Sequence, residues 1–460
     1  MRRFTWFVVW LLPSFLFCDA AFAQNSGIDH RFGDDGIASI SDPQDANTAL
    51  SAFVSCGMPN GQLRLVAAPD AIQIGSVLVD ANGNVASSVT RIPVFMAAAG
   101  NGERAIGACM GDGRIVIARE IFSDGGERQL QILRLRSDGS LDPGFGSGGE
   151  SLVDMDAYSS SLTDAETPVG INLEADGGVL VSMALSVNGS VTDAGLVRLS
   201  ADGLLRFARH YSTLPNMAPG GSTLYASAAG VGADGRVWMA GTATLAGATP
   251  VFRVRLDGTT GMVVDAPVYG SGSDSVHAGG GRLLADGSTM VLAARSTSDN
   301  LRYLPCLIVI RGNEVSRLAL PEPFAIAGSP ATAPSTMPLS TGTVIPTGEG
   351  RLLIVDALAR MADANAPLAT YLALVQLGTT TAGDQVDAHF GIAGRTQFAW
   401  RGMQICNNDA PPPQRPNHAT NWRGRPMVTG WHSRTCDWSS KRGLLARVQN
   451  AADIFANGLE

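Results

Sequence analysis

The sequence predicts an all-β protein built from repeated units of four antiparallel strands. Three observations support this: glycine turns return at nearly constant intervals, two hairpins fit within each interval, and the composition suits a chain with many turns. Charged residues make up 16% of the 460 residues, and 54 residues are glycine. Low charge combined with many glycines and short apolar runs is typical of all-β folds.

The repeat is marked by Asp-Gly or Asn-Gly turns, each followed by an apolar strand. Residues 112–118, 176–181 and 234–241 are clear copies. Asp-Gly and Asn-Gly supply the positive φ values of a tight hairpin turn, so each copy predicts two antiparallel strands. The interval between the turn glycines averages about 60 residues. The turn glycines are Gly61, Gly113, Gly177, Gly235, Gly287, Gly350 and Gly424.

A further alternating strand follows each turn by about 20 to 30 residues, as at 133–136, 196–199 and 252–256. Most of these strands lead into another turn, so each unit holds two hairpins. Four strands per unit, repeated radially, predict a single β-propeller of seven blades. Six or eight blades remain open alternatives, because the unit around Gly61 is a weak copy.

A second motif, Asp-x-x-Phe-Gly-x-x-Gly, supports the same register. It occurs at 29–36, 142–149 and 387–394, and these separations are about two and four repeat units. The first copy precedes any complete unit and leads into residues 37–40, which have the place of an outermost strand. We therefore expect this N-terminal strand to close the last blade and leave no open edge.

Residues 133–149, LRLRSDGSLDPGFGSGG, resemble the signature of the delta-60 repeat family of bacterial β-propellers. The resemblance is good in two or three repeats and degenerate at 68–105 and 395–425. It implies the propeller fold for nearly the whole mature chain. It implies no reaction, because that family is largely of unknown function.

The N-terminus has the pattern of a secretory signal. Arg2 and Arg3 precede an apolar run at 4–17, and Ala21-Phe22-Ala23 offers the small-x-small pattern of a cleavage site. The sequence thus predicts a signal peptide at 1–23 and a propeller domain at 24–460. We expect a periplasmic or secreted protein.

The charge and the lysine content exclude several classes of function. Removing the signal changes the net charge from -8 to about -9, which does not suit a nucleic-acid partner. No later apolar run is long enough to span a membrane. Lys441 is the only lysine and has no glycine-rich lead-in, so a P-loop is excluded. We expect a monomer with no cofactor and no metal.

Five cysteines remain in the mature chain, and export permits disulfides. Cys406 and Cys436 lie on segments of the last repeat that could face each other as a hairpin. Cys56 and Cys109 occupy similar places in two successive repeats, each a few residues before the turn. The sequence predicts both pairs as disulfides and leaves Cys306 as a buried free thiol.

No catalytic motif stands out, and neither H-E-x-x-H nor G-x-S-x-G occurs. His277 is the candidate binding residue, because it falls on an expected inner strand near the channel. Catalytic residues stay unassigned. We expect a non-enzymatic binding or scaffold module for an unknown extracytoplasmic ligand or protein. The alternative is a hydrolase, lyase or lactonase acting on a sugar or peptide at the channel mouth.

Overall fold

The structure is a computed structural model that describes most of residues 29–448. It leaves out 1–28, 449–460 and several internal segments, of which the longest are 95–104, 320–335 and 399–413. The predicted signal peptide lies outside the described residues. So do Gly350, Gly424 and the third Asp-x-x-Phe-Gly copy.

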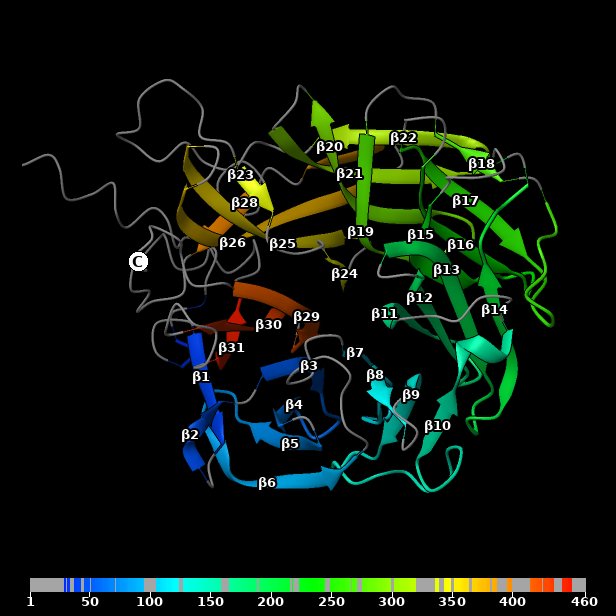
Figure 1. Ribbon diagram of the computed structural model, residues 1–460. Coiled ribbons are helices and arrows are strands. Elements are labelled where there is room, and N and C mark those ends of the chain that lie inside the picture. Colours follow the sequence, from blue (N-terminus) through cyan, green and yellow to red (C-terminus); the bar gives the residue numbers. More distant parts are fainter. Residues whose placement is uncertain are drawn as a thin grey trace, which may run out of the picture.

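The described strands form seven antiparallel sheets, here numbered 1 to 7 (Figure 1). Sheet 1 contains β3 (Ser51–Gly57), β4 (Leu63–Asp70), β5 (Gln73–Val79) and β6 (Val85–Pro93). Sheet 2 contains β7 (Ile106–Cys109), β8 (Ile115–Phe122), β9 (Arg128–Leu135) and β10 (Glu150–Val153). Sheet 3 contains β11 (Ala165–Leu173), β12 (Val179–Val187), β13 (Ser190–Leu199) and β14 (Leu205–Tyr211).

Sheet 4 contains β15 (Leu224–Val231), β16 (Val237–Ala243), β17 (Val251–Leu256) and β18 (Val268–Tyr269). Sheet 5 contains β19 (Ser275–Leu283), β20 (Met290–Ser298), β21 (Arg302–Arg311) and β22 (Glu314–Ala319). Sheet 6 contains β23 (Thr336–Pro338), β24 (Thr343–Gly348), β25 (Arg351–Asp363), β26 (Ala366–Thr380), β27 (Gly383–Val386) and β28 (Arg395–Phe398). Sheet 7 contains β29 (Gln414–Trp422), β30 (Arg425–Ser433), β31 (Lys441–Arg447), β1 (Ile37–Asp42) and β2 (Asp45–Ala49). A 3-10 helix, η3 (Met155–Tyr158), lies between sheets 2 and 3.

The prediction of an all-β chain with repeated four-stranded antiparallel sheets is confirmed, because sheets 1 to 5 each hold four strands in chain order. One strand of each sheet contacts its counterpart in the next. The contacts run from β3 through β7, β11, β15, β19, β24 and β29, and β29 contacts β3 in turn. Figure 1 shows these inner strands around the middle of the molecule.

The apolar core lies in layers between neighbouring sheets. Between sheets 2 and 3, Val116 of β8 and Val181 of β12 belong to one buried cluster with Phe145. Between sheets 7 and 1, Leu445 of β31 and Leu65 of β4 belong to another. Alternate residues of a strand point to opposite faces, so each strand can supply two such layers.

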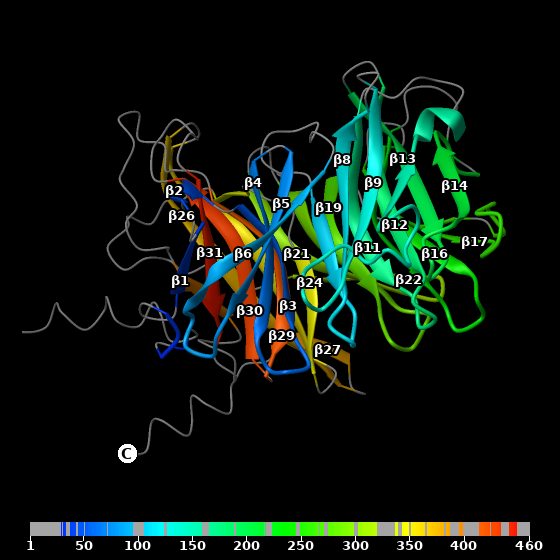
Figure 2. The ribbon, with the colours of Figure 1, turned by 90° about the horizontal axis from the view of Figure 1, so that it is seen from below.

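The N-terminal strand pairs with the C-terminal strand, as expected for residues 37–40. Ile37 lies opposite Ala446, and Ile40 lies opposite Gly443 in an antiparallel register. Figures 1 and 2 both show β1 beside β31. The N–H of Asp29 also donates to the carbonyl of Arg447 at 2.9 Å. The two ends of the described chain thus meet in sheet 7.

Deleting residues 25–40 should lower the free energy of unfolding by about 5 kcal/mol, because Phe32 and Ile40 are fully buried and each contributes about 2 to 3 kcal/mol. Thermal unfolding followed by circular dichroism measures the loss. Deleting 25–28 alone is the control, which should melt like the mature protein. Equal melting of both truncated forms would contradict the role of β1.

The turn glycines take positive φ, but the turns differ from those expected. Gly113 has φ 87°, and its N–H donates to the carbonyl of Met110, whose own N–H donates to Arg114. This is a type I turn followed by a glycine bulge, in which the residue before glycine keeps negative φ. Asp112 instead accepts the N–H of Arg114 at 3.0 Å. The expectation of positive φ at the aspartate was therefore wrong.

Positive φ at glycine recurs in the other described turns. Positive φ occurs at the predicted glycines Gly61, Gly177, Gly235 and Gly287. It also occurs in the turns between the third and fourth strands, at Gly83, Gly139, Gly203, Gly261 and Gly312. In the last sheet, Arg423 has φ 53° beside the undescribed Gly424.

Candidate functional site

Arginines that are buried or half-buried join four of the sheets to the sheet that follows each of them. In four sheets an arginine of the third strand donates to a backbone carbonyl in the turn between the third and fourth strands of the next sheet. We call these residues the inter-sheet arginines. The contacts are Arg134 to Ala201, Arg198 to Gly258, Arg253 to Gly312, and Arg447 to Ala81. The last of these joins sheet 7 to sheet 1.

The Asp-x-x-Phe-Gly motif holds one inter-sheet arginine in place. Asp142 Oδ2 accepts from Arg134 Nε at 2.8 Å, and the guanidinium carbon lies 4.7 Å from the centre of the Phe145 ring. The N–H of Gly146 then donates to the carbonyl of Asp202 in the next sheet at 2.7 Å. Asp142, Phe145 and Gly146 of the motif thus all serve the contact between sheets 2 and 3.

The first copy of the motif repeats these contacts at the chain ends. Asp29 Oδ2 lies 2.8 Å from Arg447 Nη2, and the Phe32 ring centre lies 4.8 Å from the Arg447 guanidinium carbon. The N–H of Gly33 donates to the carbonyl of Asn82 at 2.7 Å. The motif at 29–36 is thus a docking element between sheets 7 and 1.

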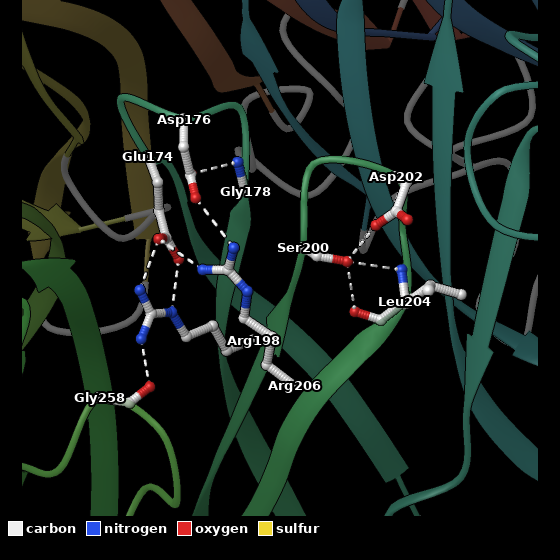
Figure 3. Close-up of polar contacts among 9 residues, drawn as sticks. All are labelled: Glu174, Asp176, Gly178, Arg198, Ser200, Asp202, Leu204, Arg206 and Gly258. Atoms are coloured by element: carbon white, nitrogen blue, oxygen red, sulfur yellow. Dashed lines mark hydrogen bonds and ion pairs between the residues drawn. The ribbon is translucent and has the colours of Figure 1, made fainter.

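Sheet 3 uses a glutamate in place of the motif aspartate (Figure 3). Arg198 donates to both carboxylate oxygens of Glu174, at 2.7 and 2.6 Å, and its third nitrogen reaches Gly258. The side chains of Glu174 and Arg198 are 5% and 10% exposed. Arg206 adds outer contacts, to Asp176 at 2.9 Å and to Glu174 Oε2 at 3.3 Å. A buried bidentate pair thus lies beneath a solvent-facing one.

A second group of charged residues lies where sheets 2 and 3 meet near η3. The carboxylates of Asp154, Asp156 and Glu166 lie within 4.8 Å of one another, and we call them the acidic cluster. Glu166 is fully buried and accepts the N–H of Met155 at 2.8 Å. Glu120 accepts the N–H of Glu166 at 2.8 Å. Carboxylate oxygens are ligands that Ca²⁺ prefers, although acidic groups also gather without an ion.

An imidazole–carboxylate pair lies on the same face of sheet 3. His210 Nε2 lies 2.5 Å from Asp193 Oδ2, and both side chains are largely buried. The register places Glu166 and Asp193 on either side of Leu185, so their side chains share one face. Helix η3 contacts β14, which carries His210 (Figure 2). A carboxylate that orients an imidazole is an arrangement used in general acid–base catalysis.

A third polar group joins the inner strands of sheets 7 and 1. The N–H of Ser55 donates to His418 Nδ1 at 3.3 Å, and Thr429 Oγ1 donates to Ser55 Oγ at 2.7 Å. Burial lowers the pKa of His418 to about 4. The Ser55 hydroxyl is itself fully buried, which does not suit a nucleophile.

The candidate residues predicted from the sequence are only partly described. His277 lies in β19, an inner strand, opposite Arg295, but its side chain is not described. The structure does not bring it together with the acidic cluster through any described contact. The predicted disulfide between Cys56 and Cys109 is confirmed and joins β3 to β7.

Cys406 and Cys436 lie outside the described residues, so their predicted disulfide stays a prediction. Cys306 is a buried free thiol, as predicted, and burial raises its pKa to about 11. Among the described residues, no helix is long and apolar enough to cross a membrane.

Comparison with known proteins matches one short stretch to a family. Residues 111–145 match a family described as "Domain of unknown function (DUF5122) beta-propeller". No curated protein matches the chain. The matched residues include the turn at Asp112-Gly113, Arg134 and the first half of the second motif copy.

Similar solved structures are distant. They include a polysaccharide lyase of family PL25, an ulvan lyase, at 10% identity and TM-score 0.47, covering 91% of this chain and 99% of that one. The soluble aldose sugar dehydrogenase of Escherichia coli has 12% identity and TM-score 0.38, with 90% and 99% covered. An α-L-arabinofuranosidase of Clostridium thermocellum has 11% identity and TM-score 0.34, with 61% and 91% covered. Because these TM-scores are below 0.5, they carry no argument about function. The family match supports a β-propeller repeat family for this chain.

Proposed function

We propose that the chain is an exported binding or scaffold module without enzymatic activity, built as a seven-bladed propeller of the delta-60 type. The N-terminal strand closes the ring, and residues 1–23 direct export to the periplasm or the cell exterior. The mature chain is a monomer. Its ligand is met by loops at a face of the disc or at the channel mouth.

The observation that carries this proposal is the set of inter-sheet arginines. In both described copies of the repeat motif, the aspartate, the phenylalanine and the first glycine make contacts that hold neighbouring sheets together. These residues recur because they hold neighbouring sheets together, so their recurrence needs no role in ligand binding or catalysis. Recognition then falls to segments that differ between repeats, as in other proteins where loops on a rigid scaffold carry function.

The disulfide supports the export part of the proposal. Disulfides persist in oxidising compartments and are rare in the cytosol, where thiols are kept reduced. Cys56 and Cys109 are paired in the structure. N-terminal sequencing of the exported protein should find Gln24 as the first residue, and an intact Met1 would contradict the signal peptide.

One observation favours the alternative, a hydrolase, lyase or lactonase acting on a sugar or peptide. The Asp193–His210 pair and the acidic cluster lie on sheet 3 near η3, where an oriented imidazole and carboxylates could move protons. Every group of this set except Asp154 and Asp156 is buried, so a substrate would have to reach it past η3.

Two assays on residues 24–460 distinguish the binding module from the enzyme. Glycan and peptide arrays identify the compounds that bind, and turnover assays then test each of these compounds for product. The binding module predicts saturable binding without product, and no change in affinity for His210→Asn. The enzyme predicts product formation that falls by about 10²-fold or more in His210→Asn. Arg206→Gln, which changes an outer ion pair, is the matched control. Product formation that depends on His210 would overturn the binding module.

A further inference from the structure

The junction between sheets 7 and 1 differs from the others because it joins the two ends of the chain. We call it the terminal junction and define it by β29 and β30 against β3, and by residues 29–33 against β31. Its inner side holds Ser55, His418 and Thr429. Its outer side holds Asp29 with Arg425 and Arg447.

The inner contact requires a neutral imidazole. A backbone N–H can only donate, so the Ser55 N–H fixes His418 Nδ1 as an acceptor and leaves the ring proton on Nε2. A proton added at Nδ1 would remove this acceptor. It would also put a charge between two packed strands, because His418 is partly buried beside the fully buried Ser55 and Thr429.

The outer contact requires a charged carboxylate. The Asp29 side chain is 3% exposed and forms ion pairs with Arg425 and Arg447. Protonation of Asp29 would leave two guanidinium groups facing each other across a neutral acid. Loss of one partner from a buried ion pair is strongly destabilising, since the remaining charge has lost its compensation.

The junction between sheets 1 and 2 is held covalently and should not separate in acid. Cys56 follows Ser55 directly in β3, and its disulfide to Cys109 holds sheet 1 to sheet 2 covalently. Adjacent residues of β3 thus make an acid-sensitive contact on one side and a covalent bond on the other. If sheet 1 separates from a neighbour in acid, we expect it to separate from sheet 7 at the terminal junction.

We infer that the terminal junction is an acid-sensitive seam, at which protonation of His418 separates sheets 7 and 1 while the remaining sheets stay packed. The separation exposes the edge between β29 and β3 and frees the motif at 29–33. The ring thus has a built-in opening point whose position follows from where the chain begins and ends.

The charges around the seam do not oppose the protonation of His418. No described charge shifts the pKa of His418, which burial alone lowers to about 4. β3, β7 and β24 carry no charged residue. The titratable and charged groups on the other strands that contact β29 are Arg425 and His432 of β30, Arg351, Asp356, Arg360 and Asp363 of β25, and Tyr371 of β26.

The direction of the pH effect follows from the lowered pKa. In the opened seam the imidazole regains an ordinary pKa of about 6.5 and binds a proton below that value, whereas in the closed seam it stays neutral until about pH 4. The closed form is therefore fully favoured above about pH 6.5. The free-energy difference that favours the closed form decreases as the pH falls toward 4.

Hydrogen exchange followed by mass spectrometry on residues 24–460 tests the seam between pH 7 and 4.5. After correction for intrinsic exchange, amide protection in β3 and β29 should fall about tenfold or more relative to β15. In His418→Asn, whose amide oxygen can accept the Ser55 N–H without titrating, this fall should shrink to about twofold or less. Cys306→Ala, in β21 of sheet 5, is the control and should respond like the unchanged chain.

Two results would overturn the inference: β3 and β29 losing protection no faster than β15, or His418→Asn losing it as steeply as the unchanged chain. Asp29→Asn provides an independent variant should His418→Asn fail to fold. Its outer contact is weakened at every pH, so the protection of β3 and β29 should already be lower than in the unchanged chain at pH 7. Equal protection of the two chains at pH 7 would contradict the outer half of the seam.

Discussion

Replacing Cys56 and Cys109 together with serine is expected to lower the free energy of unfolding by about 4 kcal/mol. The disulfide closes a loop with a sequence separation of 53 residues, and a loop of this length restricts the unfolded chain by roughly that amount. Chemical denaturation of the double variant against the unchanged chain measures the difference. A dithiol reductant should produce a similar loss in the unchanged chain and none in the double variant.

Cys306→Ala is the matched control for this prediction. Cys306 is buried and free, so its replacement should cost about 1 kcal/mol through packing and should not change the response to reductant. A double variant within about 1 kcal/mol of the unchanged chain would show that the bond does little to hold sheets 1 and 2.

Replacing Arg198 with methionine is expected to lower the free energy of unfolding by about 3 to 5 kcal/mol. The change removes two hydrogen bonds to Glu174 and one to Gly258, and it leaves the buried Glu174 carboxylate without this partner. Thermal and chemical unfolding of the purified variant give the loss. Because the contact joins sheets 3 and 4, protection from hydrogen exchange should fall first in β13 and β17.

Arg206→Met tests whether the effect belongs to the buried pair. Arg206 is about one-third exposed and contacts the exposed Asp176, with a longer contact of 3.3 Å to Glu174 Oε2, so its loss should cost no more than about 1 kcal/mol. Adding Glu174→Leu to Arg198→Met should restore part of the stability, because it removes a buried charge that then has only the partly exposed Arg206 as partner. Equal losses in Arg198→Met and Arg206→Met would contradict the buried-pair explanation.

The sequence predicted the repeat and the meeting of its ends because both depend on local signals. Glycine turns fix where strands reverse, and the motif copy at 29–36 precedes any complete unit. Together they led to the pairing of residues 37–40 with the last sheet. The turn type was missed because Asp-Gly suits two kinds of turn. The carboxylate of Asp112 accepting the Arg114 N–H selects the one with a glycine bulge.

The polar groups between sheets could be predicted only where the repeat carries them. Cys56 and Cys109 were paired correctly because they hold equivalent places in successive repeats. His418 and Ser55 are separated by 363 residues and share no motif, so only the packing of sheet 7 on sheet 1 brings them together. The acidic cluster had one signal in the sequence, the charged pair Arg119-Glu120 inside the apolar strand at 115–122.

The hydrogen bond from Asp29 to Arg447 has a consequence for how the chain can be rearranged. Because this bond brings the first and last described residues together, a short linker could join residue 448 to residue 29 without disturbing sheet 7. New ends could then be cut in an exposed turn, such as the one at Gly235. Such a circular permutant would make β31 and β1 an ordinary hairpin and place the new chain ends inside sheet 4, between β15 and β16.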